Sequence, residues 1–127
     1  MSKQKNVKNK SDKSISSKES NMLMFQGDVF VNDYFISELK KELKKNQNQT
    51  IFYFTIGLDV DDARDSILED LNRTYECKIT ESSINQYFWL INGEKIIHKN
   101  EVPNNILLLQ NYCSEHEIMP IEFSIII

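Results

Sequence analysis

The chain has 127 residues, of which 40% are hydrophobic, 27% are charged and 10% are aromatic, and its formal net charge is −4. This length accommodates one domain with a modest core, and no apolar run approaches the roughly 20 residues that span a bilayer. The N-terminal lysines are not followed by an apolar segment, which argues against a secretory signal. We therefore expect a cytoplasmic protein whose two cysteines are reduced thiols.

The charge is unevenly distributed along the chain. Residues 1–21 contain six lysines and two acidic residues, a net charge of +4, which leaves −8 on residues 22–127. This first segment carries few sizeable apolar side chains, so burial cannot offset the entropy of ordering it, and we expect a disordered tail. The favoured interpretation is a solubilising leader, and the alternative is a basic arm for nucleic acid or an acidic partner. Residues 22–127 then form one domain, with its core at 50–127.

The first predicted elements of the domain are a short apolar segment and a helix. Residues 22–31 indicate a strand or a packed arm, and Asn32 or Asp33 is a suitable helix cap. The helix that follows has one apolar stripe, and lysines crowd its last turns, where they complement the helix dipole. The stripe consists of Phe35, Ile36, Leu39 and Leu43. The polar linker 46–49 leads into an alternating run, Ile51 to Leu58, that is typical of a strand.

A strongly acidic helix is predicted over Asp59 to Tyr75. Asp59 stands at the N-cap position and Asp62 three residues later, an acidic variant of the capping box. The expected buried stripe is Val60, Ala63, Ile67, Leu71 and Tyr75. The opposite face carries Asp61, Asp62, Asp65, Glu69 and Asp70, relieved in part by two arginines. We interpret this face as either a solvated helix surface or a binding surface for a basic partner.

Two further strands and a second helix complete the pattern. Residues 77–79 predict a short edge strand, and residues 86–92 predict an aromatic strand. The Asn92-Gly93 pair is a strong signal for a type I′ hairpin, so residues 94–98 are expected to pair back as an extra strand, with a bulge at Gly93 as the alternative. Pro103 suits the first turn of a helix from Val102 to Glu117, and residues 119–127 alternate again as a strand.

The order of these elements indicates the fold class. Strand, helix and strand are followed by strand, helix and strand, which is the pattern of a ferredoxin-like split βαβ sandwich. We therefore predict an α+β, ferredoxin-like βαββαβ sandwich, preceded by an extra helix and the disordered tail.

No residue constellation predicts catalysis or a bound metal. Cys113 and His116 have a spacing that can share a metal, but only Cys77 and His98 remain as further soft ligands, and Cys113 also completes an apolar stripe. The three glycines are never clustered, so there is no phosphate-binding loop. We expect no enzymatic activity, no metal and no cofactor.

The aromatic strands raise the alternative of a nucleic-acid platform. RNA-recognition domains share this strand order and stack bases on aromatic rings of two central strands. Tyr87 and Trp89 are the candidate stacking residues, together with Tyr53 or Phe54 on the first strand. The acidic body opposes the approach of phosphates, so packing of these rings within the domain is the favoured interpretation.

Several short motifs resemble one family of bacterial regulators. In order, these are Tyr53-Phe54-Thr55-Ile56, Asp61-Asp62-Ala63, Tyr75-Glu76-Cys77-Lys78-Ile79 and Phe88-Trp89-Leu90. This layout, from about Phe35 to Phe123, resembles the ribonuclease E inhibitor family called regulator of ribonuclease activity B. The Tyr-Asp-Gly-Trp motif of that family is replaced here by Pro120-Ile121-Glu122-Phe123-Ser124. The resemblance implies a small acidic protein that binds a nuclease and restrains it.

The sequence therefore favours a non-enzymatic binding protein whose acidic residues engage a basic protein partner, for which a ribonuclease is one candidate. Complementary charge accelerates such association. The same reasoning describes an immunity protein or antitoxin against a nuclease toxin. Another alternative is a nucleic-acid-binding module that uses the basic tail and the sheet aromatics, and a small hydrolase or transferase is a third possibility.

Overall fold

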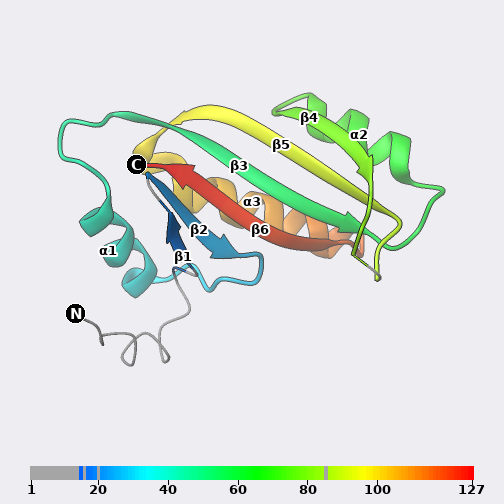
Figure 1. Ribbon diagram of the computed structural model, residues 1–127, viewed down its shortest axis with the longest axis horizontal. Coiled ribbons are helices and arrows are strands. Elements are labelled where there is room, and N and C mark those ends of the chain that lie inside the picture. The colour runs from blue at the N-terminus through cyan, green and yellow to red at the C-terminus, as the bar shows by residue number, and fades with distance from the viewer. Residues whose placement is uncertain (1–14, 16, 20, 85) are drawn as a thin grey trace.

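The computed structural model of the chain describes residues 15, 17–19, 21–84 and 86–127, which form an α+β fold. Six strands make one antiparallel sheet, and three α-helices accompany it (Figure 1). The strands are β1 (Ser17–Glu19), β2 (Met22–Gln26), β3 (Gln49–Leu58), β4 (Glu76–Glu81), β5 (Trp89–His98) and β6 (Met119–Ile126). The helices are α1 (Asp33–Glu42), α2 (Arg64–Asn72) and α3 (Val102–Glu115), and a 3₁₀ turn at Lys99–Glu101 leads into α3.

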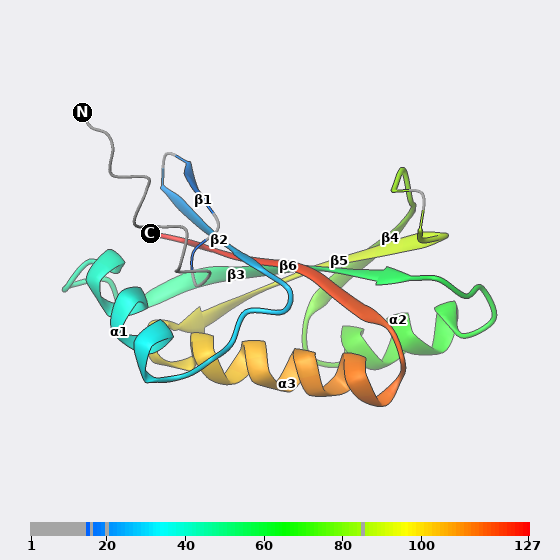
Figure 2. The same ribbon diagram turned by 90° about the horizontal axis from the view of Figure 1, so that it is seen from below.

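The strand order of the sheet is β1-β2-β6-β3-β5-β4. The three-residue β1 extends a sheet of five longer strands, and each pair of neighbours is antiparallel. The order β6-β3-β5-β4, with α2 and α3 as the two connecting helices, is compatible with a ferredoxin-like arrangement. Figure 2 shows α2 and α3 along one face of the sheet and α1 near one end. Among the described residues, no helix covers the opposite face, which we call the open face.

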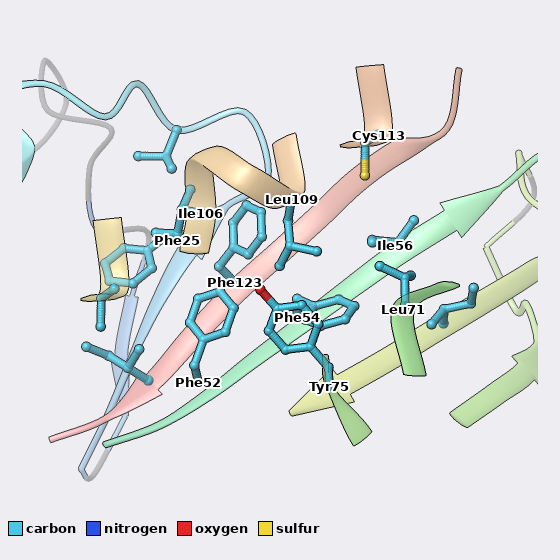
Figure 3. Packing of buried hydrophobic residues seen from close by; sticks show 14 of the residues in the cluster. Phe25, Phe52, Phe54, Ile56, Leu71, Tyr75, Ile106, Leu109, Cys113 and Phe123 are labelled. Carbon is cyan, nitrogen blue, oxygen red and sulfur yellow. The ribbon is translucent and has the colours of Figure 1, made fainter. Parts of the chain in front are cut away.

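Alternation along β3 produces the core between the sheet and the helices. Phe52, Phe54, Ile56 and Leu58 are buried on the helix side, as a strand period of two requires. The Phe52 ring stacks on Phe123 of β6 at a centroid distance of 5.9 Å, and the Phe54 ring meets the edge of Tyr75 at 5.0 Å. Leu109 and Cys113 of α3 cover the same cluster (Figure 3).

Several predicted elements are confirmed. The Asn32 side chain caps α1 by accepting a hydrogen bond from the Phe35 N–H at 2.9 Å. Pro103 lies in the first turn of α3, and the apolar stripe that Cys113 completes is buried; its other members are Val102, Ile106 and Leu109. Residues 77–79 lie in β4, which is an edge strand of the sheet as predicted.

The predicted Asn92-Gly93 hairpin is wrong. β5 is one continuous strand from Trp89 to His98, and its pairing with β3 and β4 passes through Gly93 without a register shift, so the bulge alternative fails as well. No described glycine has the positive φ that a type I′ turn needs. Gly93 serves close packing instead, because a Cβ placed there would lie 2.2 Å from Cζ of Phe54. A side chain at this position would occupy the space of the Phe54 ring.

The predicted start of the acidic helix is also wrong. α2 begins at Arg64 rather than near Asp59, ends at Asn72 and has no side-chain hydrogen bond at its N-cap residue, Ala63. Val60, a member of the predicted buried stripe, is 44% exposed. The physical reason is a contact outside the helix: Asp61 accepts a hydrogen bond from Trp89, and this holds the preceding loop away from helical geometry.

The predicted disordered tail, residues 1–21, falls largely outside the described residues. Where it is described, Ser17–Glu19 form β1 and pair with β2, so the ordered body begins earlier than the predicted Met22. The reason is that β2 offers an unpaired edge to which these residues add backbone hydrogen bonds. In the described part of the chain, no helix is long and apolar enough to cross a membrane.

Candidate functional site

The acidic residues gather at one end of the molecule. Between residues 59 and 73 the chain carries six carboxylates and two arginines. We call this segment, together with Phe88 and Trp89 at the start of β5, the acidic end. α2 and α1 lie at opposite ends of the sheet (Figure 2), and α1, with two lysines and three carboxylates, is less acidic than the segment 59–73.

A tryptophan anchors the acidic end to the sheet. Trp89 pairs with Leu58 across β5 and β3, and its indole Nε1–H donates a hydrogen bond to Oδ1 of Asp61 at 2.6 Å. The Arg64 guanidinium lies over the indole ring, 4.3 Å from its centroid, in the geometry of a cation–π contact. Arg64 Nε also pairs with Oδ1 of Asp65 at 3.4 Å. The first two contacts join the loop before α2, through Asp61, and the first residue of α2, Arg64, to the same indole ring.

Asp70 connects α2 to α3. Its Oδ2 accepts a hydrogen bond from the Tyr112 hydroxyl on α3 at 3.0 Å, and its Oδ1 lies 3.5 Å from Nη1 of Arg73. Burial is the main cause that raises the pKa of Tyr112, and the hydrogen bond to Asp70 is the second. Asp70 is therefore engaged in holding α2 against α3, and it contributes less charge to solvent than its neighbours.

The remaining carboxylates project their charge into solvent. Asp59, Asp62 and Glu69 are exposed, and none of them has an ion-pair partner among the described residues. Of the five predicted binding carboxylates, Asp62 and Glu69 are thus the most available, while Asp61 and Asp65 share Arg64. The arrangement leaves a net negative surface with fixed geometry.

Sequence reasoning missed the exposed apolar part of this surface. Phe88 is 63% exposed, and its backbone N–H donates to the Leu58 carbonyl at 2.8 Å, which places it beside the end of β3. Val60 follows Leu58 by two residues and is exposed as well. Neither residue carries a sequence signal for exposure, because both fit the apolar periodicity of their predicted elements. Apolar residues within a polar rim are typical of protein–protein interfaces.

The two predicted stacking residues do not share a face of the sheet. Trp89 belongs to the helix side, where it contacts Asp61 and Arg64. The Tyr87 ring lies against Gly57, because a Cβ added at Gly57 would lie 2.8 Å from Cδ1 of that ring. Gly57 faces the open side, since its neighbours in β3 face the core. The rings therefore do not form a single stacking platform.

A hollow of about 560 Å³ lies over strands β3, β4 and β5. Its lining includes Tyr53, Thr55, Asn92, Lys78 and the carboxylates Glu76 and Glu94. Glu76 and Glu94 are directly opposite each other in the β4–β5 pairing. Two carboxylates against one lysine do not favour a phosphate at this position.

The cysteines belong to the packed body. Cys113 is fully buried on α3, and burial raises its pKa to about 12, while burial raises the pKa of Cys77 on β4 to about 11. Both thiols are poor nucleophiles at neutral pH, since the thiolate is the reactive form. Within the described residues, no group of three or more His, Cys, Asp and Glu side chains has a metal-binding arrangement.

Comparison of the chain with models of protein families, with curated proteins and with solved structures found no match.

Proposed function

We propose that this protein is a non-enzymatic binding protein that uses its acidic end to engage a basic protein partner, and that the partner is a ribonuclease or another nucleic-acid-binding protein. The observation that carries the proposal is that the acidic end combines exposed carboxylates without ion-pair partners among the described residues, Asp62 and Glu69, with the exposed apolar residues Phe88 and Val60. A protein that binds nucleic acid presents a basic surface, to which this end is complementary.

The acidic end has the parts that an interface requires. Negative charge accelerates encounter with a basic partner, and the apolar residues supply area whose burial slows dissociation. The Trp89–Asp61–Arg64 contacts add preorganisation, because the loop does not have to be ordered at the moment of binding. We further propose that the βαββαβ part is a ferredoxin-like domain, whose motifs resemble regulator of ribonuclease activity B.

The test uses charge reversal with a matched control. Asp62→Lys/Glu69→Lys changes two exposed carboxylates of the acidic end, and Asp28→Lys/Glu94→Lys makes the same change in charge at two exposed carboxylates outside it. Tagged protein would be used to capture partners from a lysate of its own organism at moderate salt, with and without prior nuclease digestion. Bound proteins would be identified by mass spectrometry, and the captured nuclease would be assayed with and without the protein.

The expected result is a basic protein that the natural chain and the control retain, and that the acidic-end variant loses by roughly tenfold or more, since two close charge pairs are worth about 1.5 kcal/mol or more together. Equal capture by the acidic-end variant contradicts the proposal. Partners that disappear after nuclease digestion favour the nucleic-acid-binding alternative instead. A captured nuclease that remains fully active shows binding without inhibition and removes the regulatory part of the proposal.

A further inference from the structure

The opposite end of the molecule carries an apolar groove between α1 and the beginning of α3. Its volume is about 580 Å³, which is within the range of ligand-binding sites. The apolar lining residues are Val31, Ile36, Leu39, Leu43, Pro103 and Leu107. Polar residues complete it: Asn32, Asp33, Lys40, Lys99, Asn100 and Asn104. The groove is therefore apolar along its floor and polar at its rim.

Two hydrogen bonds from Lys99, a lining residue, join the two sides of the groove. The Lys99 N–H donates to the Asn48 carbonyl at 2.9 Å, and the Lys99 ammonium donates to the Lys45 carbonyl at 3.2 Å. These bonds fix the 3₁₀ turn before α3 to the linker after α1. The side chain of Leu107, which faces the groove, remains 41% exposed. The groove is preformed, so a ligand would not have to separate the two helices.

The lining of the groove holds two lysines and one carboxylate, and the stretch 38–45 adds three lysines and two glutamates outside the lining. Lys40 lines the groove, and Lys44 and Lys45 follow directly after α1; among the described residues none of these three lysines has an ion-pair partner. Asp33 is the only carboxylate in the lining, against Lys40 and Lys99. This local excess of cations stands in a body with a net negative charge, so the complementary ligand is acidic as well as apolar.

We propose that the α1–α3 groove binds an acidic amphipathic helix of another protein. α1 has ten residues and is thus about 15 Å long, which matches about three turns of a second helix lying along it. Such a helix places apolar side chains at positions i, i+4 and i+7 in the groove, and its carboxylates reach the lysines at the rim. This site is separate from the acidic end and does not depend on the function proposed there.

The probe is a synthetic helical peptide of about 16 residues, with leucine at i, i+4, i+7 and i+11 and with glutamate and alanine elsewhere. Binding to the full chain would be followed by fluorescence anisotropy and by amide chemical-shift mapping. A second peptide carries lysine in place of glutamate, and dodecanoate serves as a non-peptide acid. We expect saturable binding of the acidic peptide, with shifts at Ile36, Leu43 and Asn100, and at least tenfold weaker binding of the basic peptide.

Two pairs of variants locate the site. Leu107→Ser should weaken peptide binding about tenfold. The control is Leu108→Ser, because Leu108 is the next residue of the same helix and is 56% exposed but lies outside the groove. Leu108→Ser should change peptide binding less than about twofold. Lys40→Glu should weaken binding about three- to tenfold, and Lys78→Glu on the edge strand β4 should not. Because all four side chains are exposed or line the surface, these variants should fold normally.

Several results would overturn the proposal. These are shifts that map elsewhere, equal binding of the acidic and basic peptides, or an equal effect of Leu107→Ser and Leu108→Ser. Saturation by dodecanoate without a response to the acidic peptide would assign the groove to a fatty-acid-like ligand. Groove resonances that move with protein concentration alone would assign it to a second copy of the chain. The Asp62→Lys/Glu69→Lys variant should bind the peptide normally, which separates this test from that of the acidic end.

Discussion

Replacing Gly93 with alanine should destabilise the protein by about 2 kcal/mol, within the range of about 1 to 3 kcal/mol for an overpacked core. The added Cβ would lie 2.2 Å from Cζ, 2.4 Å from Cε2 and 2.9 Å from Cε1 of Phe54. Ordinary carbon–carbon contacts begin near 3.5 Å, so the ring or the strand would have to move by about 1.3 Å. The Phe54 ring cannot retreat easily, because it is buried and packs against Tyr75 and Phe52.

The assay is urea denaturation followed by circular dichroism, combined in a double-mutant cycle with Phe54→Leu. Leucine removes the ring, so Gly93→Ala should cost at least about 1 kcal/mol less in the Phe54→Leu background than in the natural chain. Gly57→Ala is the comparison, since its Cβ would meet Tyr87, which is only half-buried and has more freedom to move. If the cost of Gly93→Ala were the same in both backgrounds, the clash with Phe54 would not be the reason for glycine at this position.

Three further predictions follow from burial. Val60→Ser should change the free energy of unfolding by less than about 0.5 kcal/mol, because Val60 is exposed. Ile67→Ala should lower it by about 2 to 5 kcal/mol in the same denaturation assay, because Ile67 is buried. A large cost at Val60 would instead place its side chain in the core. Tyr75→Phe should lower the free energy of unfolding by about 1 to 3 kcal/mol, because it leaves Oδ1 of buried Asn105 without its 2.6 Å hydrogen bond. Thermal melting measures this change, and an unchanged stability would show that water replaces the hydroxyl. Burial raises the pKa of Cys113 from 9.0 to about 12, so the neutral thiol is favoured in the folded state and stability should fall as the pH rises above 9. Cys113→Ala should make this decline shallower between pH 9 and pH 12, while Cys77 and Tyr75, whose pKa values burial also raises, keep part of it. An unchanged decline would assign it wholly to other groups.

Periodicity predicted the order of elements after residue 49 because the relevant forces are local and repetitive. β3 alternates strictly, and the stripe of α3 recurs at helical spacing, so both are visible in the sequence. The Asn92-Gly93 prediction failed because a turn preference is a local effect that long pairing outweighs. β3 and β5 pair over ten residues, and Gly93 is required by a ring that lies 39 positions earlier in the chain.

The candidate site was only partly predictable. The sequence identified the carboxylates of the acidic end, since their charges are evident, but it placed Asp59 at a helix cap and Val60 in the core. The start of α2 depends instead on the hydrogen bond between Asp61 and Trp89, two residues 28 positions apart. The position of Phe88 beside the end of β3 involves the bond from its N–H to the carbonyl of Leu58, 30 residues earlier. The α1–α3 groove is equally invisible in the sequence, because it exists only where two separate helices approach.

The position of β6 in the sheet affects how the chain can fold during its synthesis. β6 lies between β2 and β3 and pairs with both, although about 100 residues separate it from β2. While the chain emerges from the ribosome, β3, α2, β4 and β5 can assemble from nearby segments, but β2 has no neighbour on that side until β6 is synthesised. The inner edge of β3 stays unpaired during the same interval, and such edges are prone to aggregation. Nascent chains of this protein should therefore be prone to aggregation until β6 is synthesised and pairs with β2 and β3.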